Sequence, residues 1–341
     1  MRQVRFPQQI LPFFAVPVWL LVAGCSGASP PRDEASGSLE RITLKFDGPH
    51  GTRFLGFYVA REMGYYAEEG LEVAVEDSSE ASELETIPIR SVAGEFDFAV
   101  GSEALVQAQE AGLPVVILAG IHQHGPQVLF ARAGAGIAAP ADLAGKRVVM
   151  KGASWRAWIE EFLAREGLAL EDIDEVPGGD DMTPFFRGEV DVWAGSLSSE
   201  VPAVREKGID VVTFPLHEYG IPLVGNSLYT RRDHVVSRPE LVEQFVRASL
   251  RGWRWAVEHP EEAVDEMLSS YPELVDRRKY WQLSFESAIP LIISPGVPVG
   301  DPGCGSWGEY LQPEGAVAGS DLCDSSFFLQ AVMTDGGKGE R

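Results

Sequence analysis

Short apolar strands and amphipathic helices alternate along most of this chain. Residues 41–46 (RITLKF) alternate polar and apolar side chains, which is typical of a half-buried strand, and a helical pattern follows at 54–63. The next strand patterns lie at 71–75 and 96–100. Alternating strands and helices with short connections build parallel sheets covered by helices. The sequence therefore predicts an α/β fold.

A second set of alternating elements begins at residue 147, after the chain leaves the first set near residues 127–131. Strand patterns lie at 147–150, 190–194 and 211–214, and helical patterns at 154–167, 182–188 and 201–208. Residues 223–229 are expected to return the chain to the first set, before a long helical stretch at 239–269. We expect two α/β lobes joined by two hinge crossings, with lobe 1 at 39–127 and 219–341, lobe 2 at 128–218, and a cleft between them.

The first 24 residues have the pattern of an export signal. Two arginines precede an apolar run over residues 10–22, and the sequence LVAGC ends at Cys25. An apolar run of about 13 residues is too short to cross a bilayer as a helix. LVAGC resembles a bacterial lipobox, which implies a lipid anchor on Cys25; an ordinary signal peptide with an incidental cysteine is the alternative. Residues 25–38 are rich in small, polar and acidic residues and are expected to form a flexible tether.

The other two cysteines, Cys304 and Cys323, lie in a segment rich in glycine and proline. Two thiols in an exported chain favour a disulfide. A metal site is less favoured because no histidine flanks either cysteine.

Charge and composition restrict the classes of partner. Hydrophobic residues make up 45% of the chain and charged residues 23%, which is typical of a globular protein. The formal net charge is −23, and a surface of this sign repels phosphate backbones, so we expect no nucleic-acid partner. High solubility accounts for most of this charge, which therefore does not identify a ligand.

Five stretches resemble one family in the same order along the chain. GFYVAREMGYYAEEGLEV at 56–73 resembles the opening helix of the thiamine-pyrimidine-precursor (NMT1/THI5-like) family of binding proteins. IHQHGP at 121–126 resembles a second family motif, and further stretches agree at 136–148, 219–230 and 248–263. The resemblance implies a type II periplasmic-binding fold that closes on its ligand about a hinge. It covers about residues 42–268, and the tail with Cys304 and Cys323 has no counterpart in it.

The sequence also departs from that family near the expected pocket. Ser199-Glu200-Val201 stands where close relatives carry Asn-Glu-Pro, and Ser196 stands where a tyrosine is usual. Glu200 is therefore retained, whereas its neighbours differ.

Candidate ligand contacts in lobe 1 lie where strands end or crossings begin. His50 and Phe54 lie at the first strand–helix connection, where the family places ligand contacts, although His50 could be an exposed loop residue and Phe54 could pack in the core. Ser102 and Glu103 follow a strand end; they could instead cap the next helix and complement its dipole. The remaining candidates, at the crossings, are His122, Gln123, His124, Tyr219 and Asn226, with a hinge role as the alternative for all five.

Candidate contacts in lobe 2 combine aromatic and polar groups. Ser154 and Trp155 open a helix whose backbone N–H groups could bind an anion or a carbonyl oxygen. Trp155 and Trp193 could stack on a flat ring or fill the core. Glu200 could accept a hydrogen bond from an amino group of the ligand, or be an ordinary surface acid.

These features predict a solute-binding protein that delivers a small heterocyclic or related solute, such as a thiamine pyrimidine precursor, to the permease of an ABC importer. We expect no catalytic residues, cofactor or metal, and a monomer held at the membrane through Cys25. One alternative is a receptor that reports ligand binding to a sensor kinase. The other is an enzyme like the pyrimidine synthases of the family, which use a cysteine-rich iron-binding run that this sequence lacks.

Overall fold

The computed structural model describes residues 38–78, 86–221, 223–304 and 323–336. The expected leader, Cys25 and the tether up to residue 37 lie outside the described residues. Glu103 is placed at the start of a helix, but its side chain also lies outside the described part.

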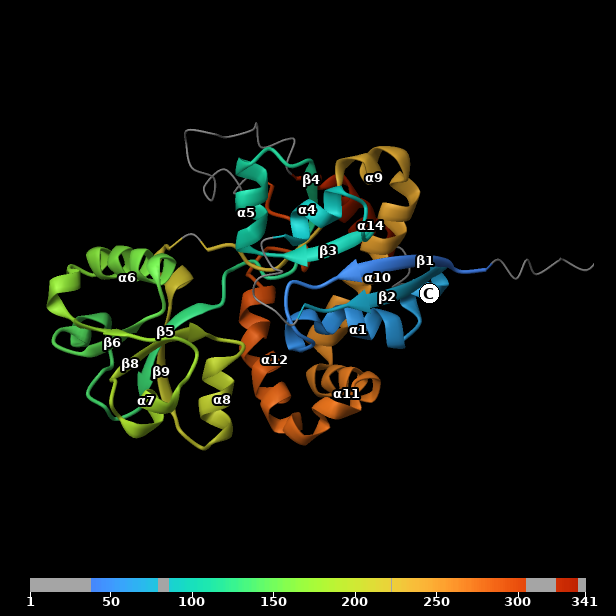
Figure 1. Ribbon diagram of the computed structural model, residues 1–341. Helices are drawn as coiled ribbons and strands as arrows, with labels where there is room; N and C mark the ends of the chain where they lie inside the picture. Colours follow the sequence, from blue (N-terminus) through green and yellow to red (C-terminus); the bar gives the residue numbers. More distant parts are fainter. Residues whose placement is uncertain (1–37, 79–85, 222, 305–322, 337–341) are drawn as a thin grey trace, which may run out of the picture. The chain divides into compact units, whose positions relative to one another are not determined.

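The first lobe is built on a five-stranded sheet with the order β2-β1-β3-β10-β4 (Figure 1). Its strands are β1 (Glu40–Lys45), β2 (Leu71–Glu76), β3 (Phe98–Gly101), β4 (Val115–Gly120) and β10 (Ser227–Arg231). β1 pairs in parallel with β2 and β3. β10 is antiparallel to both of its neighbours, β3 and β4.

The second lobe is built on another five-stranded sheet, with the order β7-β6-β8-β5-β9. Its strands are β5 (Gln127–Arg132), β6 (Arg147–Met150), β7 (Asp174–Pro177), β8 (Val192–Ser196) and β9 (Val211–Pro215). β6 is parallel to β7 and β8, and β5 is antiparallel to β8 and β9. The chain passes from the first sheet to the second between β4 and β5, and returns between β9 and β10.

Each sheet differs from the parallel arrangement that the strand–helix alternation predicts. The exceptions are β5 and β10, the two strands that follow the crossings. A strand that arrives from another lobe is not preceded by a helix of its own sheet, so the geometry that keeps consecutive strands parallel does not apply to it.

Helices surround both sheets. In the first lobe the helices are α1 (Leu55–Glu62), α2 (Tyr65–Glu68), α4 (Ile87–Val92), α5 (Glu103–Glu110), α9 (Arg232–Ser237), α10 (Pro239–Glu258), α11 (Pro260–Ser270) and α14 (Ser326–Gly336). In the second lobe they are α6 (Ala153–Arg165), α7 (Thr183–Arg187) and α8 (Glu200–Glu206). The long helical stretch expected at 239–269 is divided at His259-Pro260 into α10 and α11, because a proline cannot continue the hydrogen-bond ladder of α10.

Helices α1 and α10 approach each other closely in the first lobe because glycines lie where they cross. A Cβ on Gly56 would overlap the indole of Trp253 and lie 2.6 Å from its Cα. A Cβ on Gly252 would lie 2.8 Å from the backbone nitrogen of Ala60. Trp253 is fully buried at this contact. The core therefore requires both positions to lack a side chain.

Helix α12 (Arg278–Ile292) lies between the two lobes (Figure 1). It packs against α11 of the first lobe and against α8 of the second. Arg277, just before it, pairs with Glu206 of α8 at 2.9 Å. α12 therefore connects the lobes in addition to the two crossings.

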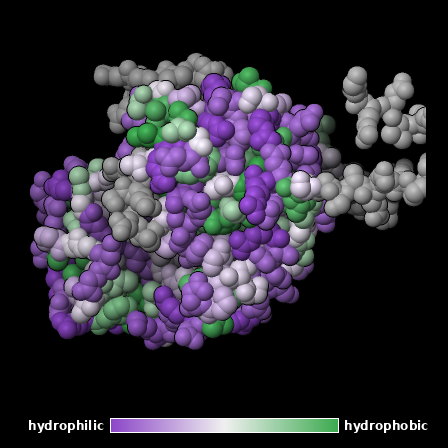
Figure 2. Space-filling view, turned by 45° about the vertical axis from the view of Figure 1, so that its right-hand side comes forward, coloured by the Kyte–Doolittle hydropathy of each residue, from purple (hydrophilic) through white to green (hydrophobic). Residues whose placement is uncertain are grey.

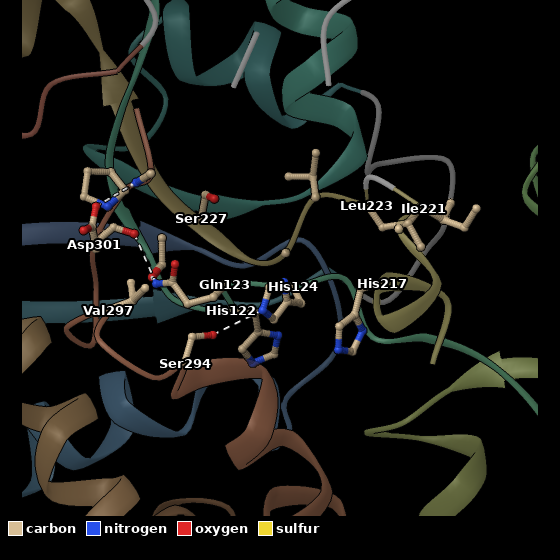
Figure 3. Close-up of a pocket in the computed structure, with 16 residues that line it drawn as sticks. His122, Gln123, His124, His217, Ile221, Leu223, Ser227, Ser294, Val297 and Asp301 are labelled. Atoms are coloured by element: carbon tan, nitrogen blue, oxygen red, sulfur yellow. Dashed lines mark hydrogen bonds between the residues drawn. The ribbon is translucent and has the colours of Figure 1, made fainter. Parts of the chain in front are cut away.

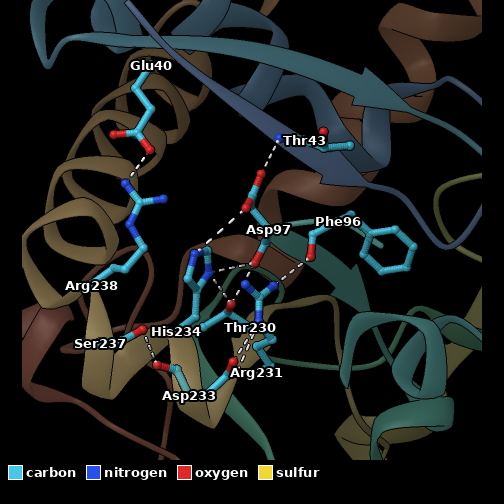
Figure 4. A network of polar contacts seen from close by, with 10 residues as sticks. All are labelled: Glu40, Thr43, Phe96, Asp97, Thr230, Arg231, Asp233, His234, Ser237 and Arg238. Carbon is cyan, nitrogen blue, oxygen red and sulfur yellow. Dashed lines mark hydrogen bonds and ion pairs between the residues drawn. The ribbon is translucent and has the colours of Figure 1, made fainter. Parts of the chain in front are cut away.

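A polar network fixes the end of β3 against its neighbours (Figure 4). The Asp97 carboxylate accepts a hydrogen bond from the backbone N–H of Thr43, and the Asp97 carbonyl accepts one from the Thr230 hydroxyl at 2.6 Å. His234 Nδ1 lies 3.2 Å from that hydroxyl. The network joins β1, β10 and α9 around a single residue.

Cys304 and Cys323 form a disulfide, with their Cα atoms 5.4 Å apart. Cys323 also pairs with Ile117 of β4 as an isolated bridge. The following helix, α14, packs against α10. The disulfide therefore joins the tail to the edge of the first sheet.

The face seen in Figure 2 is mainly hydrophilic, with small separate hydrophobic patches. The exposed large apolar residues belong to different elements and include Ile89 on α4, Val236 on α9 and Met333 on α14. Within the described ranges, we find no helix with the length and apolar composition needed to cross a membrane.

Candidate functional site

A cavity of about 360 Å³ lies between the two lobes. Its lining comes from the loop after β1, the ends of β3 and β8, both crossings, and α12. A second cavity, of about 640 Å³, shares Pro126, Gln127, Ser196 and Ser199 with it. We call the two together the interlobe cleft. Strand ends and the helices that follow them are the usual position of ligands in α/β proteins.

Arg53 is the cationic group of the first cavity, and it is held in place from two sides. Its guanidinium pairs with the Asp47 carboxylate and donates a hydrogen bond to Asn226 Oδ1 at 3.0 Å. Asn226 Nδ2 in turn donates to the Arg53 carbonyl at 3.1 Å. Ser102 lies next to Asp47, with 3.4 Å between its hydroxyl and the carboxylate. Burial raises the pKa of Asp47, while the charge of Arg53 opposes this shift.

A chain of hydroxyl groups links the lobes across the same cavity. Thr52 Oγ1 lies 2.5 Å from Ser284 Oγ on α12, and Ser284 Oγ donates to the Ser198 carbonyl of the second lobe at 2.5 Å. Thr52 begins the short helical turn Thr52–Phe54, which has no side-chain cap, and its hydroxyl points to α12.

One side of the first cavity is aromatic. Tyr280 and Trp281 of α12 and His50 of the loop after β1 line it. Trp281 Nε1 donates to the Leu274 carbonyl at 3.0 Å, which fixes the indole. His50 Nδ1 lies 2.8 Å from the hydroxyl of Tyr58, and burial lowers the pKa of His50. Fixed flat rings beside hydroxyl groups suit a polar heteroaromatic ligand.

The second cavity of the cleft belongs mainly to the second lobe. Lys151, Ser154, Trp155 and Glu200 line it. Lys151 Nζ donates to Glu200 Oε1 at 2.7 Å. The other carboxylate oxygen of Glu200 accepts a hydrogen bond from the backbone N–H of Ser196 at 3.0 Å. Glu200 is therefore satisfied within the protein.

The two crossings run side by side. The backbone N–H groups of Ile121 and His122 both donate to the Asn226 carbonyl, at 2.8 and 3.0 Å. The imidazoles of His124 and His217 stack with 4.7 Å between ring centres. This contact lines a third cavity, of about 540 Å³, outside the cleft (Figure 3).

Gln123 and His124 line this third cavity instead of the cleft. Gln123 Nε2 donates to the carbonyls of Gly120 and Asp301, at 2.9 and 3.1 Å, and His124 Nε2 lies 3.2 Å from Ser294 Oγ (Figure 3). These contacts hold both side chains against residues 294–301, outside the lining of the cleft.

His122 lies in the wall between the cleft and the third cavity. It is 4% exposed, and its Nε2 has no hydrogen-bond partner among the described residues. Burial, together with the charge of Arg53, lowers the pKa of His122 to about 3. Its imidazole is therefore neutral and can offer one nitrogen to a ligand.

We expect His122 to make the protein less stable as the pH falls. The native imidazole stays neutral down to about pH 3, whereas the unfolded chain takes up a proton near the ordinary pKa of 6.5. Between these values the unfolded state binds more protons, so the free energy of unfolding falls as the pH falls, by up to about 1.4 kcal/mol per pH unit for one group. His122→Gln should reduce this slope in urea unfolding between about pH 7 and about pH 5. Equal slopes for the wild-type protein and the His122→Gln variant would contradict this prediction. The pKa of Asp47 is shifted in the opposite direction, but Asp47 is present in both proteins.

The structure places most of the sequence candidates around the cleft. Its lining includes His50, Ser102, His122, Ser154, Trp155, Glu200 and Asn226. Glu103 is the first residue of α5, and nothing is described of its side chain.

Two aromatic candidates, Phe54 and Trp193, lie in the cores of the lobes instead, and a third, Tyr219, is half-buried at the margin of the second lobe's core. Phe54 is 1% exposed and stacks on Phe46 at 3.9 Å, and Trp193 is 1% exposed among the buried residues of the second sheet. Tyr219 packs its ring edge against Phe162 at 4.8 Å. An aromatic ring can stack on a ligand or pack in a core, so residue type alone did not distinguish these two roles.

Sequence reasoning missed Asp47, Arg53, Lys151 and the aromatic pair of α12. Asp47 directly follows the strand pattern at 41–46, and a charged residue at a strand end was an available signal. Within the described ranges, no group of three or more His, Cys, Asp or Glu residues is arranged to hold a metal ion.

The family model described as NMT1/THI5 like matches residues 51–263. The chain belongs to the NMT1/THI5-like family. The matched range includes both crossings and all of the second sheet. It ends before α12 and the disulfide, so both of these lie beyond the part that the family model describes.

Two proteins of similar sequence are named as binding proteins. The riboflavin-binding protein RibY of Chloroflexus aurantiacus is 26% identical over 267 residues, which cover 74% of this chain and 76% of that protein. A formylaminopyrimidine-binding protein of Halalkalibacterium halodurans is 27% identical over 307 residues, covering 86% and 89%.

The fold also resembles a solved structure. A putative periplasmic sulfonate-binding protein, SsuA from Methylobacillus flagellatus KT, superposes with a TM-score of 0.62 at 17% identity and covers 89% of this chain and 96% of that chain. The periplasmic-binding fold that the sequence implied is therefore confirmed.

Proposed function

We propose that this chain is an exported solute-binding protein that captures a small heterocyclic solute in the interlobe cleft and delivers it to an ABC importer. The observation that carries the proposal is a cleft lined by both sheets, both crossings and α12, in a chain of the NMT1/THI5-like family. The names of the two binding-protein relatives support a heterocycle related to riboflavin or to an aminopyrimidine.

Capture needs closure of the lobes and no chemical step. A ligand that contacts both lobes favours the closed arrangement, because some of its contacts exist only when the lobes are closed. The free energy of those contacts sets how far the equilibrium shifts. The hydrogen-bond chain from Thr52 through Ser284 to the Ser198 carbonyl lies where such contacts are needed. The crossings, joined through the Asn226 carbonyl, would act as the hinge.

The remaining parts of the proposal concern the ends of the chain and its partners. Residues 1–24 would be a signal peptide, Cys25 would carry the lipid, and the chain would face the periplasm or the cell exterior as a monomer. The partner would be the importer's permease. We expect no turnover of the ligand.

Trp155→Ala should weaken ligand binding about tenfold, because the half-buried ring of Trp155, stacked on a ligand, would contribute about 1 kcal/mol or more. Glu200→Ala should also weaken binding, through loss of the partner that holds Lys151 in place. The measurement is the thermal shift of the purified full-length chain with riboflavin and with 4-amino-5-hydroxymethyl-2-methylpyrimidine. The control is Trp255→Ala, since Trp255 stacks on His259 of the first lobe, away from the cleft lining. An unchanged shift in both cleft variants would remove these residues from the site.

A further inference from the structure

Each cationic side chain that lines the interlobe cleft already has a carboxylate partner in the protein. Arg53 pairs with Asp47, whose side chain is 9% exposed. Lys151, 8% exposed, pairs with Glu200 at 2.7 Å and reaches Asp180 at 3.3 Å. No positive charge in the described lining is therefore left for a ligand to neutralise.

The histidines of the cleft do not change this balance. His50 Nε2 lies 3.9 Å from the Asp77 carboxylate, so a proton on His50 would also be compensated within the protein. His122 is buried and neutral beside Arg53, as described above. The other polar groups that line the first cavity are hydroxyls and amides, and the remaining lining is aromatic, aliphatic or glycine.

An anion that enters such a cleft loses its hydration and gains no unpaired cation. In the second cavity it would also face the carboxylates of Asp180 and Glu200. Transfer of a charged group from water without a counter-charge costs several kcal/mol, whereas an uncharged ring with donors and acceptors can exchange its water for the hydroxyl groups of the wall.

We propose that the cleft selects uncharged heteroaromatic solutes and rejects their anionic derivatives, and that Asp47 is a specificity-determining residue because it neutralises Arg53. This inference rests on the proposed function and narrows its substrate class. A cleft built to bind an anion would instead leave an arginine without a carboxylate partner, so that its charge could pair with the ligand.

The test compares neutral probes with their phosphate esters by isothermal titration calorimetry of the full-length chain. The pairs are riboflavin with its 5′-phosphate, and 4-amino-5-hydroxymethyl-2-methylpyrimidine with its phosphate. For whichever neutral probe binds, we expect the ester to bind at least about tenfold more weakly. Asp47→Asn keeps the shape of the side chain and frees the charge of Arg53. It should therefore reduce the ratio of the two dissociation constants, ester over neutral probe, by at least about tenfold.

Two further variants keep the result interpretable. Glu200→Gln, which frees Lys151 in the other cavity, should shift the ratio in the same direction and serves if Asp47→Asn fails to fold. Asp265→Asn removes a carboxylate that pairs with Arg278 on the surface and should leave the ratio unchanged. The inference is overturned if an ester binds the wild-type protein as tightly as its neutral probe, or if neither cleft variant changes the ratio. Either result leaves the proposed function standing. Failure of all four probes to bind contradicts the proposed function, and the inference with it.

Discussion

Gly56→Ala is expected to lower the free energy of unfolding by about 2–3 kcal/mol. Position 56 lies inside helix α1, where alanine is ordinarily favoured over glycine by about 0.5–1 kcal/mol. The added methyl group would, however, overlap the buried indole of Trp253, and overpacking of a core typically costs about 1–3 kcal/mol or more. The sign of the measured change therefore decides between helix propensity and helix packing.

Gly179→Ala is the matched control for this substitution. A Cβ on Gly179 would meet nothing within 4 Å, so its stability should change by less than about 0.5 kcal/mol. Urea unfolding of both variants gives the comparison. A Gly56→Ala protein as stable as the wild type would show that α1 and α10 do not approach each other as described.

Ser196→Trp is expected to raise the dissociation constant of the ligand about a hundredfold. Ser196 ends β8 and lines both cavities of the interlobe cleft. An indole at this position would fill the space that the two cavities share, and overpacking of about 3 kcal/mol corresponds to a loss of about two orders of magnitude in affinity. The measurement is calorimetric titration with riboflavin and with 4-amino-5-hydroxymethyl-2-methylpyrimidine.

Ser269→Trp provides the same chemical change on the exposed face of α11, outside the cleft lining. We expect its affinity to equal that of the wild type. Full affinity in the Ser196→Trp protein, with its fold intact, would place the binding site elsewhere.

The alternation of strands and helices could be predicted from the sequence because each element has one buried face. The strand expected at 147–150 has the same bounds as β6, and the pattern at 211–214 differs from β9 by one residue. The parallel order failed at β5 and β10, since strand direction depends on which lobe the chain arrives from and not on local pattern.

Helix α12 was missed for a physical reason. Phe285 and Ile292 face the core of the first lobe, whereas Tyr280, Trp281 and Ser284 line the cleft. A helix packed between two lobes has apolar residues on more than one side, so it lacks the single stripe by which an amphipathic helix is recognised. Pro290 within the helix further weakens the pattern.

The cleft could be predicted only in part. Crossing residues such as His122 and Asn226 were found through family motifs, whereas the Asp47–Arg53 pair was not, because ion pairing depends on tertiary position. For Phe54 and Trp193 the sequence left both ligand contact and core packing open, because a ring that stacks on a solute and a ring that fills a core have the same chemistry. Only burial in the folded chain separates the two roles.

The central claim is that this chain binds its solute in the cleft and releases it unchanged. The most direct measurement is calorimetric titration of the full-length chain with riboflavin and with 4-amino-5-hydroxymethyl-2-methylpyrimidine, followed by mass spectrometry of the recovered compound. Our account predicts that one of the two binds saturably, one molecule per chain, and is recovered intact. No binding of either compound, or recovery of a chemically altered product, would contradict it.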